Sequence, residues 1–274
     1  MPFGTIMFES VRRKNRLKSV RGLNNIYSAY RERCHILALT LVGTRLEERY
    51  WRNKYAKNGN DAALENWSTI NHTSRNFLIE EISKFSPKSI LEVGSNAGAN
   101  LFLLSRRFPT AKIRGIDVNP ILVQEGNELF NRQHIENVRL LVGKADKLPF
   151  SDDAFEVTFT RAVLMYIGRD RIVKAIEEMF RVTTRALVFL EWHDSNASPL
   201  GKYAGHWIRN LEELLMKSFP GNATTVIKLP KELWQDRNWQ NYGHIVQMQK
   251  KEVEVPPCIH LEHGLIVQSS CASE

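Results

Sequence analysis

Residues 89–101 read Ser-Ile-Leu-Glu-Val-Gly-Ser-Asn-Ala-Gly-Ala-Asn-Leu, a pattern that predicts a strand, a tight loop and a helix in succession. It begins with a short apolar run, ending at Val93, that is typical of a buried strand. Gly94 and Gly98 follow, where a chain leaving a strand must turn sharply and let a ligand approach bare backbone. From Ala99 the apolar spacing becomes helical, so the loop ends at a helix N-terminus with free N–H groups. We expect a nucleotide-like ligand here.

The order of small residues in this loop argues against a dinucleotide. The dinucleotide fingerprint is G-x-G-x-x-G, which brings backbone against a pyrophosphate, whereas residues 94–98 read G-x-N-x-G. Glu92, in the strand before the loop, would repel a pyrophosphate but suits a ligand with an ammonium or a sulfonium group. S-adenosylmethionine has both groups. Asn96 is the middle residue of this loop, and asparagine tolerates positive φ well.

These residues resemble the first motif of class I S-adenosylmethionine-dependent methyltransferases with a type 11-like domain, apolar-(Glu/Asp)-x-Gly-x-Gly-x-Gly. Asn96 stands where this motif has its middle glycine. The resemblance implies a Rossmann-like, doubly wound α/β fold, with a mostly parallel seven-stranded sheet and helices on both faces. It also implies S-adenosyl-L-methionine as the cofactor of a methylation reaction. The cofactor-binding residues expected in this first motif are Glu92, Gly94, Ser95, Asn96 and Gly98.

A second candidate is Asp117, which closes the next expected strand in Gly-Ile-Asp-Val-Asn-Pro. It lies nineteen positions beyond Gly98, close to the spacing at which an acidic residue meets an adenosine ribose. One carboxylate can accept from both ribose hydroxyls, and we place Val118 in the same site. The alternative is that Asp117 only caps the helix that begins at Pro120.

Residues 143–150, Gly-Lys-Ala-Asp-Lys-Leu-Pro-Phe, follow the third expected strand. They resemble the family's Gly-Asp-Ala-x-x-Leu-Pro-Phe segment, which implies that Asp146 accepts from the adenine amino group and that the Ala145 N–H bonds the ring. Taken alone, the stretch could be an ordinary acidic loop. However, Glu92, Asp117 and Asp146 belong to the carboxyl ends of three successive strands. Open α/β sheets bind their ligands at that edge.

Residues 160–166 resemble the segment that lies under the methionine part of the cofactor and faces the substrate. On that resemblance Thr160 belongs to the cofactor site. The family often has a histidine where Met165 and Tyr166 stand, so a substrate role for Tyr166 or Arg161 is a more distant inference. The resemblance extends over residues 77–194.

His193 follows the fifth expected strand and is the candidate catalytic residue. Its reference pKa near 6.5 would let it take a proton from a hydroxyl or an amine. The alternative is a surface histidine after a strand, since a sulfonium is already activated and positioning can supply most of the acceleration.

The chain divides into a basic, partly helical leader (1–60), a methyltransferase domain (61–250) and a tail (251–274). A helix capped by Asn71 or Thr73 should precede the first strand. The expected strands are residues 90–93, 112–118, 138–142, 155–160, 186–192, 224–229 and 244–248, and the expected later helices are 99–108, 120–130, 171–182 and 207–219. Alternating strands and helices indicate a parallel sheet covered on both faces.

Composition narrows the class of protein. A chain of 274 residues with 43% hydrophobic content suits one α/β domain. We expect a cytoplasmic protein, since no apolar run approaches the roughly 20 residues of a membrane span and no secretory signal is evident. Three scattered cysteines, Cys34, Cys258 and Cys271, fit a reducing compartment. Cys258, His260 and His263 match no zinc spacing, so we expect no metal site.

The net charge of +8 comes from the first fifth of the chain, where residues 1–58 hold thirteen Lys or Arg against four acidic residues. This segment could bind a polyanion, a membrane surface or a phosphorylated substrate, or could simply be a solvated helix.

Two groups of aromatic residues could build an acceptor pocket, or pack under a lid. They are Trp51, Tyr55 and Trp67 before the sheet, and Trp234, Trp239 and Tyr242 between the last two strands.

The predicted function is methyl transfer to oxygen or nitrogen of a small-molecule or carbohydrate-like acceptor. The carbohydrate hint comes from Asn96 and Asn100, in a loop that looks like those of methyltransferases found with glycan synthesis. The alternatives are a nucleic-acid methyltransferase that uses the basic leader as a clamp, and a silent binding protein that keeps the fold. Glu92 and the absent G-x-G-x-x-G disfavour a nicotinamide oxidoreductase.

Overall fold

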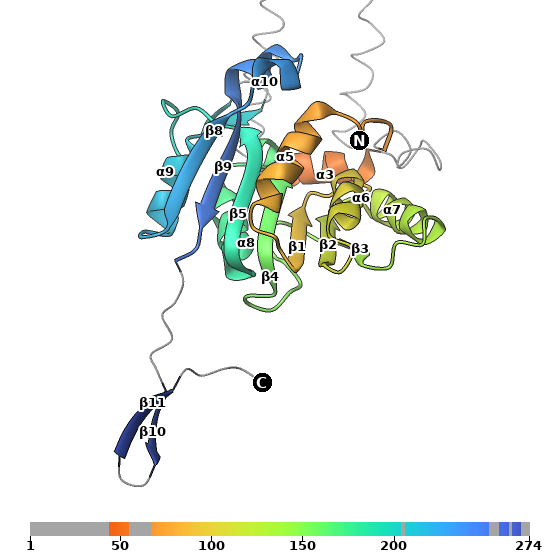
Figure 1. The fold of residues 1–274 in the computed structure, drawn as a ribbon. Helices are drawn as coiled ribbons and strands as arrows, with labels where there is room; N and C mark the ends of the chain where they lie inside the picture. Colours follow the sequence, from red (N-terminus) through yellow and green to blue (C-terminus); the bar gives the residue numbers. More distant parts are fainter. Residues whose placement is uncertain (1–43, 55–66, 204–205, 252–257, 263–264, 270–274) are drawn as a thin grey trace, which may run out of the picture.

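A computed structural model of the chain describes residues 44–54, 67–203, 206–251, 258–262 and 265–269 (Figure 1). Its centre is a seven-stranded sheet in the order β3-β2-β1-β4-β5-β9-β8. The strands are β1 (Ser89–Val93), β2 (Lys112–Asp117), β3 (Val138–Val142), β4 (Phe155–Arg161), β5 (Thr183–Trp192), β8 (Ala223–Lys228) and β9 (Gly243–Gln249). Strands β1 to β5 pair in parallel, whereas β9 is antiparallel to both of its neighbours. The expected doubly wound fold is confirmed.

Helices cover both faces of this sheet (Figure 1). One hydrophobic core lies between the sheet and α5, α6 and α7, and a second lies between the sheet and α8 and α9. Alternate residues of one strand enter opposite cores, as Ile90 and Leu91 do, because successive strand side chains point to opposite faces. The helices are α5 (Thr73–Ser83), α6 (Ala99–Arg107), α7 (Pro120–Arg132), α8 (Ile172–Arg181) and α9 (Leu211–Ser218).

Two helix starts differ from the sequence predictions. The helix expected over 207–219 begins only at Leu211, and the preceding β7 (Trp207–Ile208) pairs with β6 (Lys202–Tyr203). The reason is Asn210, whose side chain accepts from the Glu213 N–H and caps α9. Helix α5 is capped by His72, between the two candidates, through a bond from the Ser74 N–H to its Nδ1.

Helix α3 (Arg45–Asn53) comes from the segment assigned to the leader, yet it contacts the domain. Thr44, just before it, donates from its N–H and its hydroxyl to Asp170, and its hydroxyl accepts from the Gly168 N–H. These bonds join positions more than 120 residues apart in the chain. The described part of residues 1–60 is therefore hydrogen-bonded to the loop before α8.

The remaining described elements lie beyond β8 or in loops. They are the single-turn helices η3 (Leu164–Tyr166) and η4 (Lys231–Leu233), helix α10 (Arg237–Tyr242), and the hairpin of β10 (Cys258–Glu262) and β11 (Leu265–Ser269). Cys34, Cys271 and His263 fall outside the described residues, and for Cys258 and His260 only the backbone is described. The prediction on a metal group among these residues stays untested.

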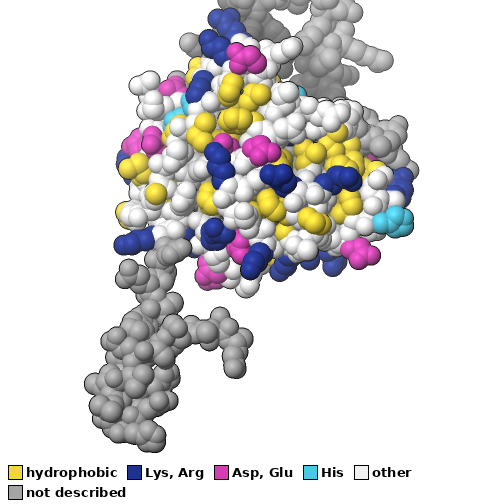
Figure 2. Space-filling model, viewed as in Figure 1, with side chains coloured by type: hydrophobic (Ala, Val, Ile, Leu, Met, Phe, Trp, Pro, Cys, Tyr) yellow, Lys and Arg dark blue, Asp and Glu magenta, His cyan; other side chains and the backbone are white. Residues whose placement is uncertain are grey.

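Charged side chains of both signs are dispersed over the face shown in Figure 2, among apolar and polar ones. Within the described ranges, no helix is long and apolar enough to cross a membrane.

Candidate functional site

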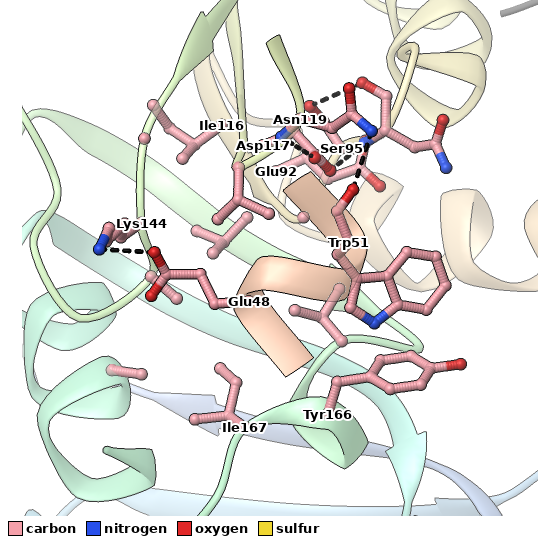
Figure 3. A pocket seen from close by; sticks show the side chains of 18 of the residues that line it. Glu48, Trp51, Glu92, Ser95, Ile116, Asp117, Asn119, Lys144, Tyr166 and Ile167 are labelled. Carbon is pink, nitrogen blue, oxygen red and sulfur yellow. Dashed lines mark hydrogen bonds and ion pairs between the residues drawn. The ribbon is translucent and has the colours of Figure 1, made fainter. Parts of the chain in front are cut away.

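A cavity of about 290 Å³ opens at the carboxyl ends of the central parallel strands (Figure 3). It is lined by eight of the ten residues expected to bind the cofactor, and the other two, Gly98 and Thr160, lie outside the lining. The eight are Glu92, Gly94, Ser95, Asn96, Asp117, Val118, Ala145 and Asp146. They come from the ends of β1, β2 and β3, so the topology of the sheet brings the three sequence motifs together.

The loop after β1 has the backbone that its sequence indicates. Gly94 has φ +77, and a Cβ there would lie 2.3 Å from Cγ2 of Val163, so only glycine fits. Asn96 has φ 52, in the left-handed region that asparagine tolerates. Gly98 has φ +85 and begins α6; a Cβ there would lie 2.7 Å from the ring of Phe130. Gly98 therefore shapes the loop by packing against Phe130, and it does not line the cavity.

Asp117 joins the end of β2 to this loop. Its Oδ2 accepts from the Asn96 N–H at 2.8 Å and its Oδ1 from the Asn119 N–H at 2.9 Å. Burial raises the pKa of Asp117, and these backbone bonds oppose the rise. The helix-cap alternative is answered by Asn119, whose Oδ1 accepts from the N–H groups of Ile121 and Leu122 and caps α7. The Val118 N–H also bonds this carboxylate, which keeps further acceptor capacity for a ligand.

Glu92 stands at the centre of a buried polar chain. Asn100 donates from Nδ2 to Oε1 of Glu92, and Arg75 donates from Nη1 to Oδ1 of Asn100, both at 2.5 Å. The other oxygen of Glu92, Oε2, is buried and has no hydrogen-bond partner among the described residues. Burial raises the pKa of Glu92 to about 8. A cationic group in the cavity would supply the missing partner.

Helix α3 crosses the cavity and is held by charges (Figure 3). Glu48 pairs with Lys144 at 2.6 Å and with Arg171 at 2.8 Å, and Arg171 also pairs with Asp146 at 3.3 Å. These ion pairs keep the pKa of Glu48 below its ordinary value, against the effect of burial. Sequence reasoning missed this contact, because nothing local to Glu48 indicates a partner about a hundred positions away.

Trp51, on the same helix, supports the other side of the cavity. Its backbone carbonyl accepts from Asn119 Nδ2 at 2.8 Å, and its ring meets the ring of Tyr166 edge-on, with centroids 4.8 Å apart. Trp51 and Tyr166 both line the cavity. Of the aromatic residues expected before the sheet, Trp51 therefore lines the cavity. Trp67 instead packs on Phe102 and Phe130, and Tyr55 lies outside the described residues.

Two predicted site residues lie elsewhere. Thr160 is fully buried and donates to Oε1 of Glu191, which also accepts from the Val163 N–H at 2.7 Å. Thr160 therefore helps to hold the loop after β4 through the carboxyl group that it shares with Val163. His193 lies in a separate hollow beside His244, its Nδ1 accepts from the Leu211 N–H at 3.1 Å, and burial lowers its pKa to about 4. In this position His193 holds the start of α9 and faces away from the cavity.

Three arginines line the cavity, and two of them, Arg75 and Arg171, carried no role in the sequence motifs. Arg75 comes from the first turn of α5, and Arg161 from the end of β4. Arg161 was considered only for its place in the segment that faces the substrate. No local pattern marks Arg75, because its partner Asn100 lies 25 positions further along the chain.

Comparison with known proteins agrees with this geometry. Residues 90–186 match the family model of a methyltransferase domain. Residues 90–186 thus form a methyltransferase domain. A trans-aconitate 2-methyltransferase from Pseudomonas paraeruginosa is 24% identical over 190 residues, which cover 68% of this chain and 63%, less than two thirds, of that protein.

Solved structures show the same fold as this methyltransferase domain. The YcgJ protein of Bacillus subtilis, 17% identical, superposes with a TM-score of 0.50, covering 66% of this chain and 100% of its own. Phosphoethanolamine N-methyltransferase 1 of Haemonchus contortus, 14% identical, superposes with a TM-score of 0.55, covering 77% of this chain and 50% of its own.

The cofactor of this domain class is S-adenosyl-L-methionine, and the cavity fits it. Gly94 leaves no room for a Cβ, so backbone itself forms that wall. The unpartnered Oε2 of Glu92 suits an ammonium group, and the remaining lone pairs of Asp117 suit hydroxyl donors. The lining thus offers acceptors for the cationic and the hydroxyl-bearing parts of the cofactor.

Proposed function

We propose that this chain transfers a methyl group from S-adenosyl-L-methionine to oxygen or nitrogen of a small-molecule or carbohydrate-like acceptor. The observation that carries the proposal is that Glu92, Asp117 and Asp146, each from a different strand end, line one cavity. The name of the Pseudomonas relative, a trans-aconitate 2-methyltransferase, supports a small acceptor.

Each carboxyl group has a part of the cofactor to hold. Asp117 would accept from the ribose hydroxyls, and Asp146 with the Ala145 N–H would bind the adenine. Glu92 would accept from the ammonium group of the methionine part. When bound, the cofactor supplies a methyl group already activated by its positive sulfur.

The rest of the lining positions the reactants and excludes water. Trp51 and Tyr166 close one side of the cavity with their rings. Burial raises the pKa of Tyr166 to about 12, so its phenol stays protonated at neutral pH and can donate a hydrogen bond rather than act as a base. With His193 outside the cavity, we assign the acceleration to orientation and proximity, which suffice for an activated methyl donor.

The test begins with calorimetric titration of S-adenosylmethionine into the full chain, followed by incubation with methyl-labelled cofactor and fractionated cell metabolites. We expect binding and one labelled small-molecule fraction. Asp117→Ala should abolish both, whereas Asp152→Ala, which removes an exposed carboxylate from a turn, should leave both unchanged. Absence of cofactor binding by the unaltered chain would overturn the proposal.

A further inference from the structure

Arg161 presents a guanidinium group to the cavity from the end of β4. Its Nη2 donates to Oγ of Ser74 at 3.0 Å, and its Nε is buried without a partner. Within the described residues Arg161 forms no ion pair. The side chain is half-buried, and a cation withdrawn from water without an acidic partner is costly, so its position calls for a ligand that supplies the negative charge.

The surroundings hold this guanidinium in place. It lies over the ring of Trp234, 4.6 Å from the centroid. Trp234 in turn is stacked on the buried ring of Trp239, with centroids 3.8 Å apart and planes 4° apart. The side chain is therefore fixed between an indole stack and the cavity, and its remaining N–H groups have a defined direction.

The charges around Arg161 leave it uncompensated. Glu92 and Glu191 act on it electrostatically, and Arg75 repels it. Burial raises the pKa of Glu92 to about 8 and that of Glu191 to about 7, so neither supplies a full negative charge at neutral pH. Glu191 also uses its Oε1 for Thr160 and Val163.

The cofactor's own carboxylate does not account for both arginines. S-adenosylmethionine carries one carboxylate, whereas two arginines besides the ion-paired Arg171 line the cavity, the buried Arg75 and the half-buried Arg161. Arg75 is joined through Asn100 to Glu92, the residue assigned to the ammonium group of the methionine part. Arg75 is thus the cation placed beside that end of the cofactor, and Arg161 has no bond to this chain of residues.

We propose that Arg161 binds an anionic group, a carboxylate or a phosphate, of the methyl acceptor, so that the acceptors of this site are organic anions. This inference rests on the proposed function, because it concerns the second substrate of the same cavity. The planar guanidinium suits either anion, since both can accept two parallel N–H bonds.

The experiment uses the full chain saturated with S-adenosylhomocysteine and titrates four probes by calorimetry. The carboxylate probes are acetate and tricarballylate, the phosphate probe is glycerol 3-phosphate, and glycerol is the neutral counterpart. We expect one class of anion to bind and glycerol not to bind. Arg161→Gln should lower the affinity for that anion about tenfold or more. Arg161→Lys should lower it by less, because lysine keeps the positive charge and loses only the two parallel N–H donors of the guanidinium.

The affinity for S-adenosylhomocysteine separates the outcomes. It should change less than about threefold in Arg161→Gln, which also shows that the variant is folded. Arg106→Gln is the matched control, since Arg106 is an exposed arginine whose guanidinium lies 5.9 Å from the Phe102 ring centroid. A loss of S-adenosylhomocysteine binding in Arg161→Gln would assign Arg161 to the cofactor and overturn the inference.

Two further results decide the matter. Binding of S-adenosylhomocysteine without any anion binding, or equal anion binding by the unaltered chain and Arg161→Gln, would overturn the inference and leave the proposed function standing. Failure of the unaltered chain to bind S-adenosylhomocysteine would overturn both.

Discussion

Glu92 is buried in the wall of the cavity, and its raised pKa of about 8 means that it holds a proton at neutral pH in the cofactor-free protein. An ammonium group next to its free Oε2 would stabilise the charged form and lower that pKa. Cofactor binding at pH 6.5 should therefore release close to one proton from Glu92.

The release is measured by calorimetric titration of S-adenosylmethionine in phosphate and in Tris, whose ionisation enthalpies differ. The binding enthalpy of the unaltered chain should depend on the buffer, and that of Glu92→Gln should not. Equal enthalpies in both buffers for the unaltered chain would remove Glu92 from contact with the ammonium group.

Asp117 has two tasks, since it accepts from the backbone of Asn96 and Asn119 while it faces the cavity. Asp117→Asn keeps one oxygen acceptor but loses the charge, so cofactor affinity should fall about tenfold or more. The free energy of unfolding should fall by about 1.5–3 kcal/mol, because one of the two backbone hydrogen bonds to the charged carboxylate is lost.

Calorimetry gives the first quantity and urea denaturation the second. Asp152→Asn is the control, since the exposed ion pair of Asp152 with Arg181 contributes little. Equal cofactor affinity in Asp117→Asn and the unaltered chain would contradict the ribose assignment.

Helix α3 lies across the cavity, and the carboxylate of Glu48 pairs it with the loop after β3 and with the loop before α8. Glu48→Gln would remove the charge that pairs with Lys144 and Arg171. We expect the cofactor to dissociate about three to ten times faster, since the helix would open more often, with little change in melting temperature.

Stopped-flow displacement of bound cofactor measures that rate. Glu80→Gln is the comparison, because both side chains of the ion pair between Glu80 and Arg107, at 3.9 Å, are exposed. A dissociation rate in Glu48→Gln equal to that of Glu80→Gln would mean that α3 does not control access.

The central elements could be predicted because their signals are local. The apolar run before Gly94 and the helical spacing after Ala99 each lie within a few residues of what they form, and β1 and α6 follow. The start of α9 and the position of α3 could not, because Asn210 and Glu48 act through specific bonds that the apolar pattern does not record. The same holds for His193, whose Nδ1 is taken by Leu211.

For the molecule as a whole, the parallel sheet explains why most of the cavity lining could be predicted and two of its arginines could not. The residues predicted to bind the cofactor sit at strand ends, which topology gathers at one edge. Arg75 and Arg161 reach the cavity from α5 and β4, and only the packed structure shows that they face it together.

Two buried carboxyl groups, Glu92 in the wall of the cavity and Glu191 near the end of β5, give the whole molecule a dependence on pH. The folded pKa of Glu92 is about 8 and that of Glu191 about 7, against an ordinary value of 4.5. Between these values the folded state binds more protons than the unfolded state, so each group lowers stability as pH rises toward its folded pKa. His193 acts oppositely, but only between its folded pKa of about 4 and its ordinary 6.5.

Above pH 6.5 the two carboxyl groups remain, so the melting temperature of the cofactor-free protein should fall by a few degrees from pH 6.5 to 8. Each proton contributes at most about 1.4 kcal/mol per pH unit. Glu92→Gln should flatten the fall up to pH 8, and Glu191→Gln only its part up to about pH 7, whereas Glu80→Gln should follow the unaltered chain. Saturating S-adenosylhomocysteine should also flatten it, since an ammonium group beside Glu92 lowers the pKa that causes the fall. Calorimetric scans of the unaltered chain that stay level or rise over this range would show that these carboxyl groups are already ionised in the free protein.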